Sequence, residues 1–303
     1  MLIIDTHAHI YSPDEEQYPP MPGPLRPPEG TASLARLHLE CKNNGVKSVC
    51  AIQTGSFYRF DNRYILDTSK ANLEWLACVC TLDPDNPDSP ALLRHAVRDY
   101  GVRGMRSIAS AGGGFDHPGI RALWKTALDE GIVINILITN RDPDMDKGTE
   151  FDEVFEPYVL SEIRELVDQA KVLLEEFPTL PVVLDHCLNL EAGPDLDLWL
   201  AEVIRLSEHK NLHGKLSFVA SGTKTGYPCD DMLDVCLKVI DAFGPERCVW
   251  GSDFPCELWA PKINYTDHLR IFTNDLPLTE SARAKILGET AQQLWFSARG
   301  ANS

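Results

Sequence analysis

The chain has 303 residues, of which 44% are hydrophobic and 24% charged, and its formal net charge is −17 at pH 7. This is the composition of a globular protein with a large core, and the acidic balance disfavours nucleic acid and anionic membranes as partners. No apolar run approaches the ~18 residues of a membrane span, and the amino terminus lacks the features of a signal peptide, so a cytoplasmic location is expected. The nine scattered cysteines favour buried, reduced thiols over a disulfide framework.

The amino-terminal stretch is apolar up to Ile4 and then carries Asp5, His7 and His9. Because successive strand residues point to opposite faces, we expect these three polar side chains on one face. Two imidazoles about 7 Å apart along a strand can converge on one metal ion or one substrate. By itself, the pattern is equally that of a strand that happens to carry two histidines.

Apolar and amphipathic segments alternate along the rest of the chain. Residues 10–32 are rich in proline, which excludes a helix or a central strand, and Ser33 is expected to cap a helix that stops at Asn44-Gly45. The further predicted strands are 46–53, 75–81, 102–108, 132–139, 182–186, 213–219 and 248–252. The further predicted helices are 90–100, 118–130, 160–177, 198–208, 232–243, 280–286 and 289–296.

Eight strands that alternate with helices predict a single (β/α)8 barrel domain over residues 1–303. Helix-to-strand connections are short and often begin with glycine, as a left-handed helix terminus requires. The strand-to-helix connections are long: 10–32, 109–117, 140–159, 220–230 and 254–278. A doubly wound open sheet is the competing fold, but no glycine-rich phosphate loop follows the first strand, and no nucleotide cofactor is expected.

Active sites of such barrels form at the carboxyl ends of the strands. The polar residues predicted at or just beyond these ends are His7, His9, Arg59, Arg106, His186, Lys215 and Asp253. Three histidines and an aspartate that fall together at this end favour an enzyme over a chance arrangement.

These segments also resemble the amidohydrolase superfamily, in its branch of metal-dependent and metal-independent lactonases, to which a branch of decarboxylases is related. The resemblance spans nearly the whole chain. The matching segments are Ile4–His9, Gly101–Arg106, Val183–His186, Lys215–Ser217, Trp250–Pro255 and Gly288–Trp295. The resemblance implies a hydrolase that opens a lactone of a sugar acid or of an aromatic catabolite.

The chain departs from the binuclear members of that superfamily, which carry a bridging lysine or acid on the fourth strand and a histidine on the fifth. Here the fourth strand has arginines and the fifth has Asn135. The resemblance therefore implies one of two arrangements. One zinc, or another divalent ion, is held by His7, His9 and Asp253, with His186 as a further candidate. Alternatively, hydrolysis proceeds without a metal and the histidines bind the substrate carbonyl directly.

In either arrangement Asp253 is expected to be the general base that deprotonates water. His7 and His9, or their zinc, would polarise the carbonyl and hold the oxyanion. His186 would orient the water or the substrate, or assist the leaving alkoxide.

Substrate binding is expected to involve arginine. Arg103 and Arg106 face opposite ways in a regular strand, and Arg106, nearer the carboxyl end, is predicted to clamp a carboxylate or hydroxyl, with Arg59 beside it. Lys215 is either a site residue or one half of an ion pair at the base of the barrel. The expected partner is an anionic or polyhydroxylated small molecule.

Two other functions remain open at this point. A zinc-dependent decarboxylase could use the same fold and the same histidines. A non-catalytic barrel could bind a ligand or store a metal. The sequence also leaves a homo-oligomer open.

Overall fold

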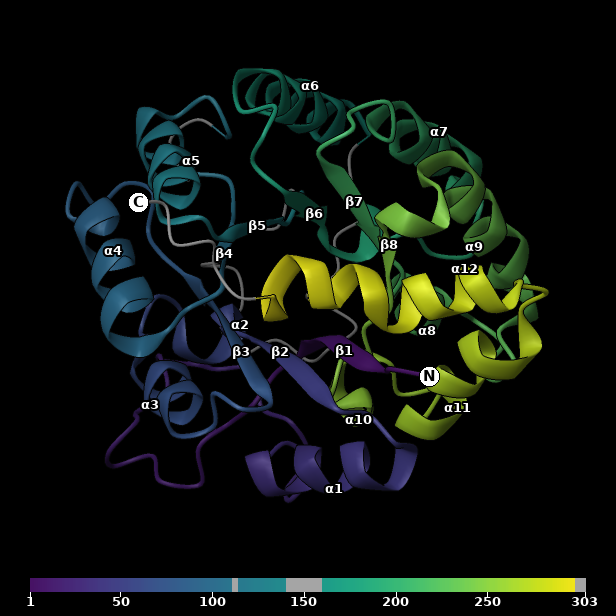
Figure 1. The fold of residues 1–303 in the computed structure, drawn as a ribbon, viewed down its shortest axis with the longest axis horizontal. Coiled ribbons are helices and arrows are strands. Elements are labelled where there is room, and N and C mark those ends of the chain that lie inside the picture. Colours follow the sequence, from purple (N-terminus) through teal and green to yellow (C-terminus); the bar gives the residue numbers. More distant parts are fainter. Residues whose placement is uncertain (111–113, 140–159, 298–303) are drawn as a thin grey trace.

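The computed structural model describes residues 1–110, 114–139 and 160–297. Within these residues eight parallel strands follow one another in sequence order around a barrel, and helices surround them (Figure 1). The strands are β1 Ile4–Ala8, β2 Ser48–Ile52, β3 Leu76–Thr81, β4 Gly104–Ser107, β5 Val133–Ile136, β6 Val182–Leu184, β7 Leu212–Lys215 and β8 Cys248–Val249. The predicted (β/α)8 barrel is confirmed.

The barrel is completed where its first and last strands meet. Ala8 forms a parallel bridge with Phe254, beyond the end of β8, and the N–H of Thr6 donates to the carbonyl of Trp250 at 3.1 Å. The loop after β8 is therefore held directly against β1.

The outer helices are α1 Leu34–Asn44, α3 Arg63–Ala71, α4 Ser89–Tyr100, α5 Pro118–Glu130, α6 Leu160–Glu176, α7 Leu196–Leu206 and α9 Asp230–Phe243. Ser33 caps α1 by accepting from the N–H of Arg36, as predicted, and Gly45 ends it with a φ of 71°. Short helices lie in the strand-to-helix connections: α2 Gly55–Tyr58, α8 Phe218–Gly222, α10 Cys256–Trp259 and α11 Tyr265–Arg270, which continues as η3 Ile271–Asp275. None of the helices in the described ranges is long and apolar enough to cross a membrane.

Most predicted strands are shorter in the structure, β6 and β7 among them. β7 ends at Lys215, although the strand is predicted to continue to residue 219, and residues 218–222 form the buried helix α8. β6 ends at Leu184, so His186 lies in the turn η1 Asp185–Cys187 beyond the strand.

The structure also has a helix that the sequence pattern does not predict, α3. Its buried face carries Thr68 and Ser69 next to Ile65. Two of these three side chains are polar, so few apolar residues stand at helical spacing in this short segment.

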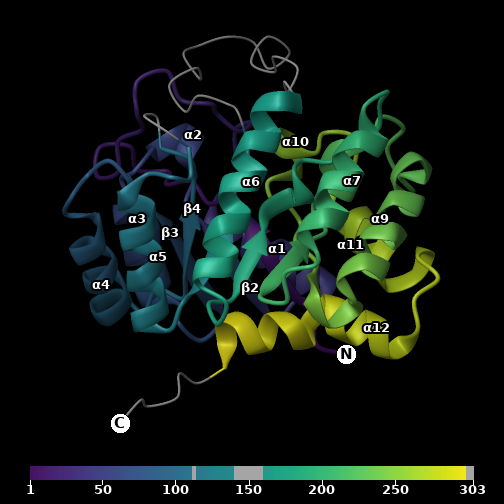
Figure 2. The ribbon, with the colours of Figure 1, turned by 90° about the horizontal axis from the view of Figure 1, so that it is seen from above.

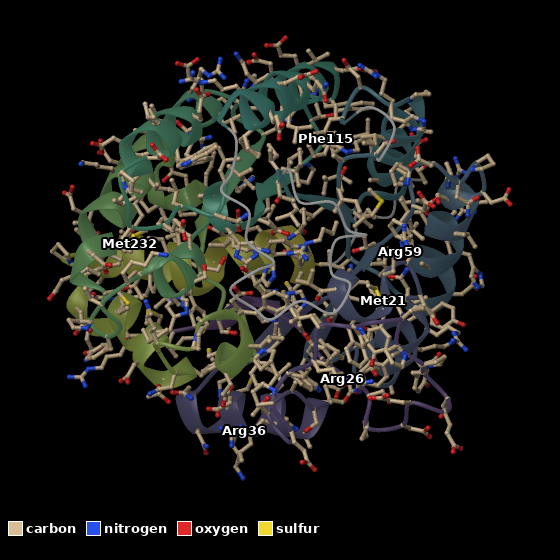
Figure 3. All side chains as sticks on the ribbon, turned by 180° about the vertical axis from the view of Figure 1, so that it is seen from behind. Met21, Arg26, Arg36, Arg59, Phe115 and Met232 are labelled. Carbon is tan, nitrogen blue, oxygen red and sulfur yellow. The ribbon has the colours of Figure 1, made fainter. Side chains whose placement is uncertain are left out.

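The carboxyl-terminal helical segments close one end of the barrel. They are α12 Glu280–Ala284, η4 Lys285–Glu289 and η5 Gln292–Phe296, and η2 Pro245–Arg247 precedes β8. Trp295 and Ala291 pack against Ile4 and Val249 in an apolar cluster inside the barrel. Figure 2 shows α12 at this end and α2 and α10 at the other. Figure 3 looks onto the opposite end, where the strands finish and where Arg59 is labelled.

All nine cysteines are buried and none forms a disulfide, as the sequence predicts. Burial raises the pKa of several of these thiols, among them Cys50, Cys80 and Cys256. A thiol with a raised pKa is a poor nucleophile at neutral pH. The chemistry therefore has to come from other side chains.

Candidate active site

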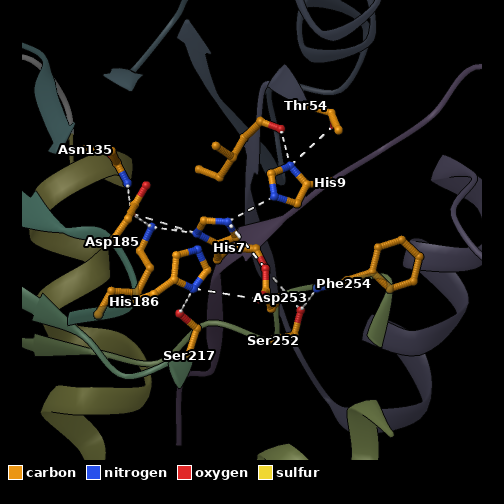
Figure 4. A network of polar contacts seen from close by, with 12 residues as sticks. His7, His9, Thr54, Asn135, Asp185, His186, Ser217, Ser252, Asp253 and Phe254 are labelled. Carbon is orange, nitrogen blue, oxygen red and sulfur yellow. Dashed lines mark hydrogen bonds and ion pairs between the residues drawn. The ribbon is translucent and has the colours of Figure 1, made fainter. Parts of the chain in front are cut away.

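Polar side chains from three strand ends meet inside the mouth of the barrel (Figure 4). The Nε2 atoms of His7 and His9 are 3.1 Å apart. Asp253 Oδ1 lies 3.6 Å from His7 Nε2, and Asp253 Oδ2 lies 3.8 Å from His186 Nδ1. All four side chains are buried. The structure thus brings together the four residues that the sequence predicts as catalytic.

Asp5 does not share the face of the two histidines, so this expectation is wrong. The pairing of β1 with β2 shifts register between Asp5 and Ala8, which interrupts the alternation of side chains. The Asp5 carboxylate instead accepts from the N–H of His7 at 3.0 Å, from the N–H and hydroxyl of Ser252 at 2.9 and 2.6 Å, and from the Tyr265 hydroxyl at 3.0 Å. Asp5 therefore fixes the loop after β8 relative to the backbone of His7.

Asp185 is the centre of a buried charge cluster that sequence reasoning missed. Its carboxylate accepts from Lys215 Nζ at 2.7 Å, from Arg106 Nε at 2.9 Å and from Asn135 Nδ2 at 3.0 Å. Burial opposes ionisation, but Lys215 and Arg106 together hold the pKa of Asp185 well below its usual range. Arg106 and Lys215 are cations at inward-facing strand positions, and two buried cations require an anion nearby. This requirement, together with the position of Asp185 next to His186, could have identified Asp185 from the sequence.

The hydrogen bonds of His7 and His9 determine which ring nitrogens carry protons. His9 Nδ1 lies 3.0 Å from the carbonyl oxygen of Ile52, which can only accept, so the His9 proton is on Nδ1. His7 Nδ1 lies 3.2 Å from the ammonium of Lys215, which can only donate, and His7 Nε2 faces the unprotonated His9 Nε2. These two contacts assign the His7 proton to Nε2, although Arg106 Nη2, also a donor, lies 3.2 Å from that nitrogen. Burial lowers the pKa of both rings, and Lys215 lowers that of His7 further. Both imidazoles are therefore neutral, and His7 Nε2–H donates to His9 Nε2.

Asp253 is poised to accept a proton near neutral pH. Burial raises its pKa to about 7, although Arg106 and Lys215 act in the opposite direction. The efficiency of a general base is greatest when its pKa lies near the working pH. The environment of Asp253 therefore suits the role predicted for it.

The backbone at Asp253 and His186 is left-handed, with φ values of 58° and 52°. Such conformations are costly for residues other than glycine and are concentrated at functional sites. The hydroxyl of Ser217 lies 2.8 Å from His186 Nδ1 and holds the ring in place. Strained backbone and a fixed ring indicate that both side chains are aimed by the fold.

The three residues predicted to bind substrate do not lie together in the structure. Arg106 and Lys215 belong to the charge cluster around Asp185, and Arg106 Nη2 also lies 3.2 Å from His7 Nε2. Arg59 is exposed at the rim, outside this cluster, and its guanidinium lies 5.7 Å from the centre of the Phe60 ring. The predicted connection 140–159 lies outside the described residues.

His7, His9 and Asp253 match a metal site in type and spacing. One ligand atom from each lies within 4.8 Å of the other two, and two imidazoles with one carboxylate suit zinc. The proton arrangement does not complete this ligand set, because Lys215 keeps the His7 proton on Nε2, the atom that would bind the ion. Arg106 places a positive charge beside the same nitrogen. For all three residues to bind a divalent ion, the His7 proton would have to leave Nε2.

Comparison with known proteins identifies the family. Over 199 residues the chain is 28% identical to an L-fucono-1,5-lactonase of Burkholderia ambifaria, an alignment that covers 64% of this chain and 60% of the lactonase. Among solved structures, an amidohydrolase of Burkholderia multivorans with bound zinc is 20% identical and matches 98% of this chain and 100% of its own, with a TM-score of 0.71. A 5-carboxyvanillate decarboxylase of Sphingomonas paucimobilis is 15% identical and matches 98% and 99%, with a TM-score of 0.70. The model of the amidohydrolase family matches residues 4–296, and the chain belongs to this family.

Proposed function

We propose that the chain hydrolyses a small-molecule lactone. The observation that carries this proposal is Asp253, a buried carboxylate with a pKa of about 7 that lies beside His7 and His186. Family membership and the similarity to a lactonase support the same reaction. Because that similarity covers less than two thirds of the lactonase, the activity rests on the site as well as on the comparison.

Asp253 would supply and recover the proton that lactone hydrolysis requires. Its carboxylate accepts a proton from water, and the resulting hydroxide adds to the carbonyl carbon of the lactone. The ring C–O bond then breaks, and the leaving oxygen takes the proton back from Asp253. The product is the open hydroxy acid, and the carboxylate is restored. His186, on the Oδ2 side of Asp253, orients the water or the leaving oxygen.

The substrate carbonyl oxygen would lie beside His7 Nε2 and Arg106 Nη2, within hydrogen-bonding distance of both. His7 Nε2 and Arg106 Nη2 are 3.2 Å apart, and both are N–H donors in the proton arrangement derived above. Two donors cannot bond to each other, whereas one carbonyl oxygen can accept from both, and it would share or take over the His7 N–H that donates to His9 Nε2 in the free protein. Preorganised donors at the atom where negative charge develops are the main source of catalysis in acyl transfer. Lys215 acts through the His7 ring, as a positioning residue.

A panel of lactones and acids tests this proposal. We expect the purified protein to release acid from at least one lactone, measured with a pH indicator or by titration. Release of CO2 from an aromatic acid, with no lactone opened, would instead favour a decarboxylase. Ligand binding without turnover of any compound would favour a non-catalytic barrel.

The pH dependence of kcat/KM should follow the ionisation of Asp253. Below a pH of about 7 the carboxyl group is protonated and cannot accept a proton from water, so kcat/KM should fall about tenfold per pH unit. Above that pH it should reach a plateau. A profile measured from pH 5 to pH 9, with spontaneous hydrolysis subtracted, checks this. A profile that is flat between pH 5.5 and pH 8 contradicts the role of Asp253.

Removal of metal should leave kcat/KM within about threefold of the untreated value, because Arg106 already supplies positive charge at His7. The measurement is turnover before and after dialysis against a chelator, with metal content determined in parallel. Loss of turnover that zinc restores would contradict this expectation. It would support the other predicted arrangement, in which one ion is held by His7, His9 and Asp253.

A further inference from the structure

One buried carboxylate, that of Asp5, lies between the backbone segments that carry His7 and Asp253. Asp5 Oδ1 accepts from the N–H of His7 at 3.0 Å and from the N–H of Ser252, the residue before Asp253, at 2.9 Å. The N–H of Asp253 in turn donates to the carbonyl of His7 at 2.9 Å. The distance of 3.6 Å between His7 Nε2 and Asp253 Oδ1 therefore depends on how Asp5 holds these two segments together.

The hydroxyl of Ser252 holds the loop on both sides of Asp253 (Figure 4). It donates to Asp5 Oδ2 at 2.6 Å and accepts from the N–H of Phe254 at 3.0 Å. The left-handed φ of 58° at Asp253 is costly for a residue other than glycine and persists only where the surroundings impose it. The hydrogen bonds of Asp5 and Ser252 to the residues on either side supply that constraint.

The remaining donor to Asp5 comes from a helix outside the barrel. Tyr265 is the first residue of α11, which packs against α1 (Figure 1), and its buried hydroxyl donates to Asp5 Oδ2 at 3.0 Å. Its ring meets that of Trp250, at the start of the loop after β8, edge to face with centres 5.8 Å apart. Within the described ranges the hydroxyl forms no hydrogen bond with a residue of the proposed chemistry. Its effect on catalysis would therefore pass through Asp5.

The position of the Asp5 carboxylate depends on its hydrogen-bond donors, because no cation of the described residues pairs with it. Burial raises the pKa of Asp5, and hydrogen bonds from Ser252, His7 and Tyr265 act in the opposite direction. Without the Tyr265 hydroxyl, Oδ2 keeps only the hydroxyl of Ser252, and the carboxylate can rotate away from the two N–H groups on Oδ1. A displacement of about 1 Å at a reacting group can cost on the order of 10²-fold in rate.

We propose that Tyr265 is a positioning residue for hydrolysis: its hydroxyl fixes the Asp5 carboxylate, which fixes His7 and the loop that carries Asp253. The inference rests on the proposed lactonase function and adds to it a residue from outside the mouth of the barrel. Because Asp5 and Ser252 stand between Tyr265 and the general base, loss of the hydroxyl should slow the chemical step and leave substrate binding unchanged.

Tyr265→Phe tests this role, because it removes the hydroxyl and keeps the ring that packs on Trp250. On the best lactone of the panel, kcat should fall about tenfold and KM should stay within about twofold. Tyr227→Phe is the matched control, since the Tyr227 hydroxyl also donates to an aspartate, Asp275, but at the surface. The control should change neither constant. Thermal melting should show that both variants are folded at the assay temperature.

A double-mutant cycle shows whether the effect passes through Asp5. Asp5→Ala should lower kcat about a hundredfold. Adding Tyr265→Phe should then lower kcat less than about twofold further, because the hydroxyl has no carboxylate left to hold. If Asp5→Ala does not fold, Ser252→Ala replaces it. There the Tyr265 hydroxyl is the last donor to Asp5 Oδ2, so its removal should lower kcat by more than in the wild-type background.

Three results would overturn the inference and leave the lactonase proposal standing. The first is full kcat in Tyr265→Phe, with or without a loss of thermal stability. The second is a change in KM as large as the change in kcat. The third is the same loss of kcat from Tyr265→Phe in the wild-type and the substituted backgrounds. If the wild type opens no lactone, the proposed function fails and the inference falls with it.

Discussion

Replacing Asp253 by asparagine should lower kcat about a thousandfold, because general base catalysis contributes on the order of 10²–10⁴ and the amide cannot accept a proton. Asparagine is the matched substitution for this position. It has the shape of aspartate and tolerates the left-handed backbone, which has a φ of 58° here. Steady-state kinetics on the best lactone of the panel give the value. A variant with near-wild-type turnover would exclude Asp253 as the base.

Stability distinguishes loss of chemistry from loss of fold in Asp253→Asn. The pKa of Asp253 is raised to about 7 in the folded chain, so the native state binds more protons than the unfolded state between about pH 4 and pH 7. The ionised carboxylate therefore destabilises the fold above pH 7. We expect the variant to gain at least about 1 kcal/mol of unfolding free energy at pH 8. Asp67→Asn, which changes an exposed carboxylate, should alter neither activity nor stability.

Replacing Asp185 by asparagine should destabilise the protein by about 3–5 kcal/mol, the usual cost of leaving a buried charge without its partner. The carboxylate is fully buried and compensates both Lys215 and Arg106. Urea unfolding at pH 7 measures the change. Glu15→Gln is the control, because it removes an exposed ion pair with Arg26 and should cost less than about 1 kcal/mol.

A second variant keeps this prediction testable if Asp185→Asn does not fold. Adding Lys215→Met removes one of the two uncompensated cations, so the double variant should recover part of the lost stability. The pKa of Asp185 is held below its usual range in the folded protein. The ionised carboxylate therefore contributes fully to the free energy of unfolding above the pKa of the unfolded state, about 4, and this contribution is lost as the pH falls through the lower folded pKa. The difference in unfolding free energy between the wild type and Asp185→Asn should therefore decrease at acidic pH. Equal stability at pH 7 would show that the cations do not depend on Asp185.

The sequence was sufficient to predict the barrel and the convergence of its catalytic candidates. The alternation of apolar strands with amphipathic helices specifies a parallel barrel, and in a barrel all strands finish at the same end. His7 and Asp253, 246 positions apart in the printed chain, meet for that reason alone. Among the elements that were not predicted, α3 buries the polar residues Thr68 and Ser69, and α8 begins inside the predicted strand 213–219.

The sequence did not predict which polar side chains form ion pairs and hydrogen bonds with one another. Asp185 is one of many acids in an acidic chain, and only the register of β4, β6 and β7 places it between Arg106 and Lys215. Whether Lys215 was a site residue or an ion-pair partner depended on the same contacts. Hydrogen bonds to carboxylates and rings act over about 3 Å, whereas sequence patterns describe elements that extend over tens of ångströms.

Sequence alone therefore determined the class of fold, the end of the barrel that carries the site and the residue types found there, because these follow from periodicity and strand direction. Tertiary structure decided the rest. It turned Asp5 away from the histidines through a shift in register, and it set the His7 proton on Nε2 through Lys215 and His9. Each of these results depends on which side chains from distant segments come within hydrogen-bonding distance, and only the closed barrel fixes that.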